Sequence, residues 1–209
     1  MRIDSLKART RPQRPATVRA FCCERETMYY GNVKYSDIAN GEGVRTSLFV
    51  SGCTHHCKEC FQPETWNFSF GQEFTSDVAD RIIESLKAPW VEGLTVLGGE
   101  PMEPVNQHGL VPLLRRVRAE APGKNIWCYT GDRFEALVDP KSPRHTDATD
   151  ELLSLIDVLV DGPFERDLYD ITLRFRGSSN QRLIDVPATL EAGEVVLWKG
   201  DEELARHSM

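Results

Sequence analysis

Short apolar runs alternate with amphipathic segments from Tyr29 onward, and this alternation restricts the chain to a small number of folds. The apolar runs have the length of buried strands, and the segments between them repeat apolar residues at the three- and four-residue spacing of a helix face. Strands that alternate with helices form a parallel sheet or an incomplete barrel. We therefore expect an α/β fold with a mostly parallel sheet.

The expected elements follow the chain in order. The strands are four well-defined runs and two weaker ones: Val44–Val50, Leu94–Leu97, Ile126–Tyr129, Val158–Val160, Leu183–Val186 and Glu194–Trp198. The helices run from Thr75 or Ser76 to about Lys87, from Leu110 to Ala119 and from Asp150 to Ile156. Ligands in such folds bind beyond the carboxyl ends of the strands. The segments expected at that end are the polar loop after Val50, Gly98-Gly99, Thr130-Gly131 and Asp161.

Three of the six cysteines lie within eight residues of the loop after Val50, as Cys53, Cys57 and Cys60. Thiolates are soft ligands that suit iron–sulfur clusters and zinc. Three cysteines on a short loop can hold three corners of a 4Fe–4S cluster and leave one iron open to another ligand. The same loop can hold zinc if His55 or His56 is the fourth ligand. The run alone leaves both metals open.

Charge and composition exclude other classes of function. The net charge is −7, although the first 27 residues hold seven Lys or Arg against three Asp or Glu, so the rest of the chain is acidic. We expect no nucleic-acid binding, because an acidic body lacks a basic stripe. No apolar run is long enough to span a membrane, and no secretory segment precedes the clustered thiols, so we expect a cytoplasmic protein. Residues 1–27 are expected to be a disordered tail and residues 28–209 one domain.

A second motif, Gly98-Gly99-Glu100-Pro101, directly follows the strand at Leu94–Leu97. Glycines let the backbone approach a ligand, and a carboxylate beside them can pair with an ammonium group. With the cysteine run, this motif resembles the radical S-adenosylmethionine superfamily. Further stretches resemble one family within it, the anaerobic ribonucleoside-triphosphate reductase-activating proteins, over about residues 29–186. They are Asn40–Thr46, Phe49–Cys53, Thr65-Trp66, Gly71–Phe74, Pro122–Trp127, Thr130-Gly131, Leu159–Phe164 and Arg176–Gln181.

The resemblance implies a partial (β/α) barrel of the radical S-adenosylmethionine type, with one 4Fe–4S cluster and S-adenosylmethionine. It implies that the cluster ligands are Cys53, Cys57 and Cys60, and it assigns no catalytic residue beyond them. The residues implied for the cosubstrate are Glu59, Cys60 and Phe61 on the nucleoside side and Gly98, Gly99 and Glu100 on the methionine side. Glu59 stands where the superfamily often has an aromatic residue, so a stacking contact with adenine falls to the backbone or to Phe61.

The resemblance also implies partners. Reduced flavodoxin or a similar donor supplies an electron, and a 5′-deoxyadenosyl radical takes hydrogen from a glycine in the glycyl radical subunit of the anaerobic ribonucleoside-triphosphate reductase. Related activases place a monovalent cation near positions such as Thr130 and Asp161, and the sequence leaves that site open.

Two alternatives remain at this stage. One is a radical enzyme that acts on a small metabolite, like 7-carboxy-7-deazaguanine synthase. The other is a zinc-stabilised interaction module without catalysis. Three cysteines have no expected part in either site: Cys22 and Cys23 in the tail, and Cys128 as a small core residue.

Overall fold

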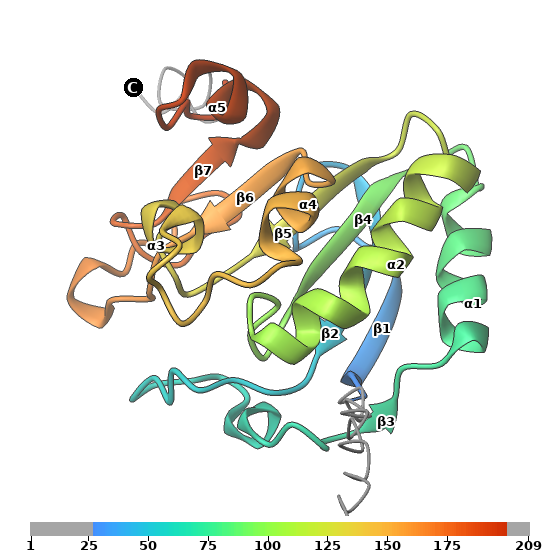
Figure 1. The fold of residues 1–209 in the computed structure, drawn as a ribbon, viewed down its shortest axis with the longest axis horizontal. Coiled ribbons are helices and arrows are strands. Elements are labelled where there is room, and N and C mark those ends of the chain that lie inside the picture. Colours follow the sequence, from blue (N-terminus) through green and yellow to red (C-terminus); the bar gives the residue numbers. More distant parts are fainter. Residues whose placement is uncertain (1–26, 200–209) are drawn as a thin grey trace, which may run out of the picture.

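A mixed seven-stranded sheet organises residues 27–199, the part of the chain that the computed structural model describes (Figure 1). The strand order is β3-β1-β2-β4-β5-β6-β7. The strands are β1 (Tyr29–Asp37), β2 (Val44–Val50), β3 (Gln72–Glu73), β4 (Val91–Gly98), β5 (Asn125–Tyr129), β6 (Val158–Asp161) and β7 (Arg182–Asp185). Strands β2, β4, β5 and β6 are parallel, whereas β1 and β7 pair antiparallel with their neighbours. The sheet is open, with β3 and β7 at its edges.

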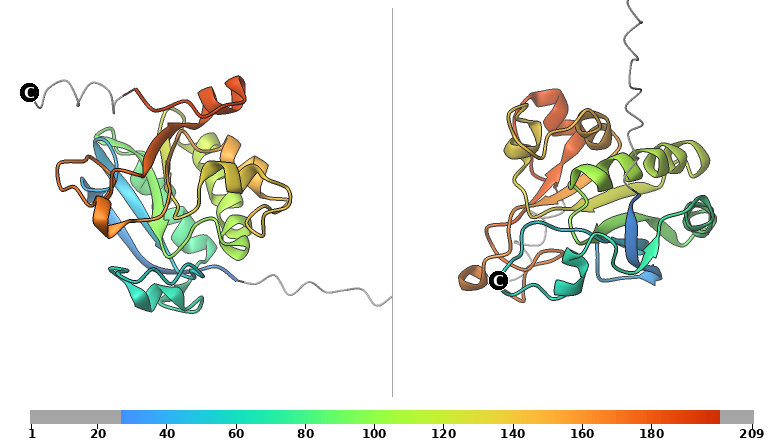
Figure 2. Two further views of the ribbon diagram at one scale, coloured as in Figure 1. Left: turned by 90° about the vertical axis from the view of Figure 1, so that its left-hand side faces the viewer. Right: turned by 60° about the horizontal axis from the view of Figure 1, so that its bottom comes forward.

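Helices α1, α2 and α4 cover one face of this sheet (Figures 1 and 2). The helices are α1 (Ser76–Leu86), α2 (Pro104–Glu120), α3 (Phe134–Val138), α4 (Thr149–Ser154) and α5 (Val186–Ala192). Two short 3-10 helices span Pro63–Trp66 and Arg166–Leu168. Among residues 27–199, no helix combines the length and the apolar character needed to cross a bilayer.

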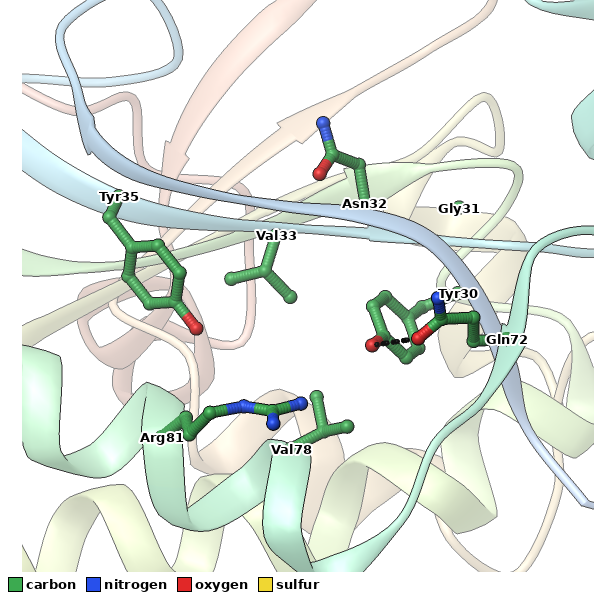
Figure 3. Close-up of a pocket in the computed structure, with 8 residues that line it drawn as sticks. All are labelled: Tyr30, Gly31, Asn32, Val33, Tyr35, Gln72, Val78 and Arg81. Carbon is green, nitrogen blue, oxygen red and sulfur yellow. Dashed lines mark hydrogen bonds between the residues drawn. The ribbon is translucent and has the colours of Figure 1, made fainter.

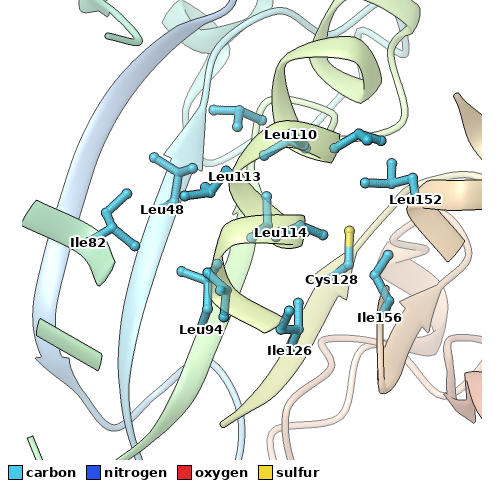
Figure 4. Close-up of a cluster of buried hydrophobic side chains, with 14 of the residues drawn as sticks. Leu48, Ile82, Leu94, Leu110, Leu113, Leu114, Ile126, Cys128, Leu152 and Ile156 are labelled. Carbon is cyan, nitrogen blue, oxygen red and sulfur yellow. The ribbon is translucent and has the colours of Figure 1, made fainter. Parts of the chain in front are cut away.

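The main core lies between the sheet and these helices. Alternate residues of the strands, such as Leu48, Leu94 and Ile126, point toward Leu113 and Leu114 of α2 (Figure 4). All five side chains are at most 2% exposed, so each contributes about 1.5–3 kcal/mol of burial. The predicted α/β class is therefore confirmed, with the parallel strands restricted to the middle of the sheet.

Two sequence predictions differ from the structure at element boundaries. Helix α2 begins at Pro104, whereas the prediction started it at Leu110. The first turns lack the apolar pattern of a buried helix, because Asn106 and Gln107 are buried through hydrogen bonds to backbone carbonyls. The strand predicted at Glu194–Trp198 is reduced to a single antiparallel bridge between Leu197 and Ile184.

The outer strands of the sheet also differ from the prediction. Strand β1 was not predicted, and most of its residues are exposed or half-buried, so it has no continuous apolar run. Strand β7 was predicted, but it runs antiparallel to β6. Residues 1–26 of the predicted tail and residues 200–209 of the predicted domain lie outside the described part of the chain.

Candidate functional site

The cysteine loop begins where β2 ends. Cys53 is buried, and Cys57 and Cys60 are half-buried, with the backbone N–H of Cys60 donating to the carbonyl of Cys57 over 3.1 Å. Burial raises the pKa of Cys57, His55 opposes that effect, and the neighbouring Cys53 and Cys60 add to it. All three thiols thus lie on one short loop directly beyond the carboxyl end of β2.

The loop after β4 is joined to the cysteine loop through the backbone. The N–H of Gly99 donates to the carbonyl of Val50 over 2.7 Å, and the N–H of Glu100 donates to that of Gly52 over 2.8 Å. This approach requires glycine, because Gly98 has φ +114° and a Cβ at Gly99 would lie 2.6 Å from the Gly52 oxygen. The two motifs singled out in the sequence therefore form one continuous site.

Glu100 lies at the centre of this junction. Its side chain is 1% exposed and accepts hydrogen bonds of 2.8 Å from the backbone N–H groups of Met102 and Gly131. The Nδ1 atom of His55 lies 3.3 Å from Oε2 of Glu100. Burial raises the pKa of Glu100, and His55 opposes this rise. Glu100, which is predicted to lie on the methionine side, thus lies beside the cysteine loop.

His55, which the cysteine run left open as a zinc ligand, connects the cysteine loop with the loops that follow β4 and β5. Its Nε2 lies 3.1 Å from a carboxylate oxygen of Asp132, which follows β5, and its Nδ1 lies 3.6 Å from Sγ of Cys53. The interaction with Asp132, together with those with Cys53 and Glu100, raises the pKa of His55 to about 10. No pattern in the sequence indicated this contact, because Asp132 lies 77 positions away from His55.

A buried ion-pair network supports the same loop. The guanidinium of Arg144 lies 2.5 Å from Glu103 and 2.9 Å from Asp132, and it donates to the Thr54 hydroxyl over 2.9 Å. The side chains of Arg144 and Glu103 are only 12% and 5% exposed. Sequence reasoning missed both residues; the only signal was the position of Glu103 three residues after Glu100.

The predicted nucleoside-side residues lie on the outer part of the cysteine loop. The side chain of Phe61 is 89% exposed, and its ring centroid lies 6.4 Å from that of Phe164. The carboxylate of Glu59 lies 3.5 Å from the guanidinium of Arg166. Both partners belong to the segment that connects β6 with β7.

Asp161 is engaged by an arginine. It is fully buried, and its two oxygens accept hydrogen bonds from Arg182 over 2.9 and 2.5 Å and from the N–H of Phe134 over 2.8 Å. The hydroxyl of Thr130 accepts from the N–H of Asp132. The guanidinium of Arg182 therefore neutralises the buried carboxylate of Asp161.

The donor set of the cysteine loop fits an iron–sulfur cluster with three protein ligands. Cys128, the remaining cysteine in residues 27–199, is 1% exposed and points into the helix-covered core (Figure 4). Burial raises the pKa of its thiol well above the usual range, which disfavours the thiolate form that binds metal. Cys22 and Cys23 lie outside the described residues.

A separate pocket of about 330 Å³ lies between β1 and α1, away from these residues (Figure 3). Its lining includes Tyr30, Tyr35, Gln72 and Arg81, and it includes no predicted site residue.

Comparison with known proteins decides the family. Residues 39–184 match the 4Fe-4S single cluster domain family. The chain is 43% identical over 147 residues to the anaerobic ribonucleoside-triphosphate reductase-activating proteins of Salmonella typhi and of Escherichia coli K12, which is 69% of this chain and 90% of each relative. It is 37% identical over 156 residues to the activating protein of enterobacteria phage T4, or 75% of this chain and 93% of that relative. The chain belongs to this family of activating proteins.

Membership of the activating-protein family confirms the resemblance predicted from the motifs. The match to a 4Fe–4S domain spans the whole cysteine loop and identifies the cofactor as an iron–sulfur cluster. It decides between the two metals that the cysteine run left open, in favour of iron. The matched range also includes the Gly-Gly-Glu loop and strands β2 to β6, so the site described above lies within the shared domain.

Proposed function

We propose that this chain activates an anaerobic ribonucleoside-triphosphate reductase by forming a glycyl radical on it. The reaction transfers one hydrogen atom from a glycine α-carbon of the reductase to the 5′-deoxyadenosyl group of S-adenosylmethionine, and methionine is the other product. The observation that carries this proposal is the hydrogen-bonded junction between the cysteine loop and the Gly98–Glu100 loop. It joins the loop of the three cysteines to the loop of a buried carboxylate, in a chain of the activating-protein family.

Cys53, Cys57 and Cys60 hold the cluster in this proposal. A 4Fe–4S cluster with three cysteine ligands keeps one iron open and, once reduced, supplies the electron for reductive cleavage of the sulfonium. Reduced flavodoxin or a similar protein is the proposed source of that electron. The half-buried position of Cys57 and Cys60 leaves this side of the loop within reach of a cosubstrate.

The remaining predicted site residues bind S-adenosylmethionine. Gly98 and Gly99 bring backbone groups close to the methionine moiety, and Glu100 offers a carboxylate to its ammonium group. Glu59, Cys60 and Phe61 lie on the nucleoside side. Since Glu100 is buried and held by two backbone N–H groups, its carboxylate is already oriented before the cosubstrate arrives.

We also propose that residues 28–209 form a single radical S-adenosylmethionine domain with a partial (β/α) barrel. The four parallel strands β2, β4, β5 and β6, with helices on one face, are the features that support this architecture. In such a barrel the opposite face and the carboxyl ends of the strands are left for the reaction.

The test is anaerobic reconstitution with iron and sulfide, followed by reduction and addition of S-adenosylmethionine and the purified reductase. We expect a glycyl radical signal in the EPR spectrum of the reductase and one 5′-deoxyadenosine for each radical formed. Cys57→Ala should give neither product. Formation of 5′-deoxyadenosine without a reductase radical, at any ratio of the two proteins, would favour a small-molecule substrate instead.

A further inference from the structure

Exposed apolar side chains gather beside the cysteine loop. We call them the apolar rim, and they are Phe61, Leu168, Tyr169 and Ile171, together with the half-buried Phe164, whose ring lies between those of Phe61 and Tyr169. Phe61 is 89% exposed, Ile171 84% and Tyr169 49%. Large apolar groups left in water at one place mark an interaction surface more often than a random scatter does.

The rim is joined to the site by direct contacts. Phe61 directly follows the proposed ligand Cys60, and its ring lies 6.4 Å from that of Phe164, which in turn lies 6.3 Å from that of Tyr169. Arg166 packs over Tyr169 at 5.7 Å and lies 3.5 Å from Glu59 of the cysteine loop. Figures 1 and 2 show the two segments at the same end of the molecule.

The segment that carries most of the rim is stiffened by its own backbone. The N–H of Ser179 donates to the carbonyl of Leu168, and the N–H of Asp170 donates to that of Gly177. Tyr169 and Ser178 form an antiparallel bridge, and Ser178 is fully buried. These bonds fix the backbone of the segment that carries Leu168, Tyr169 and Ile171. A surface fixed before binding loses little conformational entropy when a partner arrives.

We propose that the apolar rim is the docking surface for the glycine-bearing segment of the reductase; this inference rests on the proposed function. Glycine has no side chain, so the residues on either side of it must supply the contacts that hold it at the site. A partner that brings a backbone α-carbon to the cysteine loop past Phe61 meets the rim. The rim therefore suits a glycine-containing loop with apolar residues on its flanks, and aromatic anchors of this kind dominate interface energies.

The substitution Ile171→Glu tests the proposal, because Ile171 contacts neither the cysteine loop nor the proposed cosubstrate residues in any interaction described above. Ile38→Glu is the matched control: Ile38 is 75% exposed and precedes β2, at the opposite end of the parallel strands. Both variants are compared with the wild type as cluster-loaded proteins. The measurements are iron content, cleavage of S-adenosylmethionine without reductase, affinity for the reductase and yield of glycyl radical.

We expect Ile171→Glu to weaken binding to the reductase by about tenfold or more, the effect of a charge placed in an apolar contact. Its iron content and its cleavage of S-adenosylmethionine without reductase should equal those of the wild type. Ile38→Glu should match the wild type in every measurement. If Ile171→Glu loses iron, Ile171→Ser replaces it, and the same loss of affinity is expected.

Three results would overturn the proposal. Wild-type affinity in both Ile171 variants would remove the rim from the reductase interface. Slower reduction by flavodoxin, with normal radical formation after chemical reduction, would assign the rim to the electron donor. A change in the oligomeric state with unchanged reductase binding would assign it to a second copy of the chain. Failure of the proposed function is distinct, because the wild type itself would then form no glycyl radical.

Discussion

The carboxylate of Glu103 accepts two hydrogen bonds from Thr54, one from its backbone N–H and one from its hydroxyl, both of 2.7 Å. Thr54 directly follows Cys53, so this contact fixes the first turn of the cysteine loop to the start of α2. The other oxygen of Glu103 pairs with Arg144. The Glu103 carboxylate thus anchors the cysteine loop, and Arg144 neutralises its charge.

We predict that Glu103→Gln lowers the free energy of unfolding at pH 7 by about 2–3 kcal/mol, because Arg144 keeps only Asp132 as a charged partner. Urea denaturation of the cluster-free protein measures this change. Glu84→Gln is the control: it breaks an exposed pair with Lys87 on α1 and should leave stability nearly unchanged. Equal effects of the two substitutions would contradict a special role for Glu103.

The pair of Glu103 and Arg144 also predicts how the stability of the protein depends on pH. Burial raises the pKa of Glu103, but the hydrogen bonds from Arg144 and Thr54 outweigh burial and leave the pKa below its ordinary value of 4.5. A carboxyl with a lowered pKa in the folded state stabilises the protein above its unfolded pKa. That contribution is lost as the pH falls through the folded value. The stability difference between wild type and Glu103→Gln should therefore be constant above about pH 5.5 and shrink below pH 4.5.

Arg182 is predicted to be structural. Arg182→Met leaves Asp161 fully buried with one backbone N–H as its partner, and we expect a loss of about 3 kcal/mol or more in the free energy of unfolding. Arg115→Met, which breaks an exposed pair with Glu151, should cost much less. If potassium restored the stability of Arg182→Met and also stabilised the wild type, a cation would share this site after all.

The positions of the central strands could be predicted because buried strands appear in the sequence as runs of apolar residues. The run at Val44–Val50 became β2 without any change of bounds, since β2 is a central strand and most of its residues are buried. Helix α1 was predicted for a related reason: Val78, Ile82, Ile83 and Leu86 repeat at helical spacing. The outer strands carry a weaker apolar pattern, because most side chains of β1 are exposed or half-buried.

The site likewise has a part that the sequence predicts and a part that it does not. The cysteines and the Gly-Gly-Glu motif are local patterns, so their residues could be named before the structure was known. The contacts of His55 with Asp132 and of Thr54 with Arg144 join residues from different loops, and only the sheet order brings those loops together. One sequence without its fold contains no signal for such pairs.

Glu100→Gln is predicted to weaken binding of S-adenosylmethionine by at least about tenfold, because a charge-assisted hydrogen bond is worth about 1.5–3 kcal/mol. The cluster should remain, since Glu100 is not one of the proposed ligands. Equilibrium binding to the reconstituted protein measures the affinity, and iron analysis checks the cluster. An unchanged affinity would place Glu100 in a purely structural role, as an acceptor for the N–H groups of Met102 and Gly131.

A chain that begins at Met28 is predicted to retain the cluster and the activity. Met28 is 4% exposed and packs against Gly109 of α2, and its carbonyl accepts from the N–H of Phe74. The contacts of the described domain therefore begin at this residue. Iron content and glycyl radical yield should equal those of the full chain, and a loss of either would show that residues 1–27 contribute to the fold or to the partner.

The last prediction concerns the number of protein ligands. Cys53→Ala, Cys57→Ala and Cys60→Ala should each abolish the normal cluster and the cleavage of S-adenosylmethionine, because each removes one of three thiolates. Cys128→Ala should keep four irons per chain, since Cys128 points into the core on the helix-covered face. It should cost about 1 kcal/mol of stability or less, as the loss of a small buried side chain does.

The same variants distinguish a cluster with three cysteine ligands, which leaves one iron free to bind the cosubstrate, from a cluster with four. A cluster with three cysteine ligands can bind the cosubstrate directly, so adding S-adenosylmethionine to the reduced wild type and to Cys128→Ala should change the EPR spectrum of both in the same way. Cys22→Ala and Cys23→Ala should behave like Cys128→Ala. If any of these three variants lost the cluster, a fourth thiolate would close the last iron to a ligand. Direct binding of S-adenosylmethionine to the metal would then fail, and with it the radical reaction proposed for this chain.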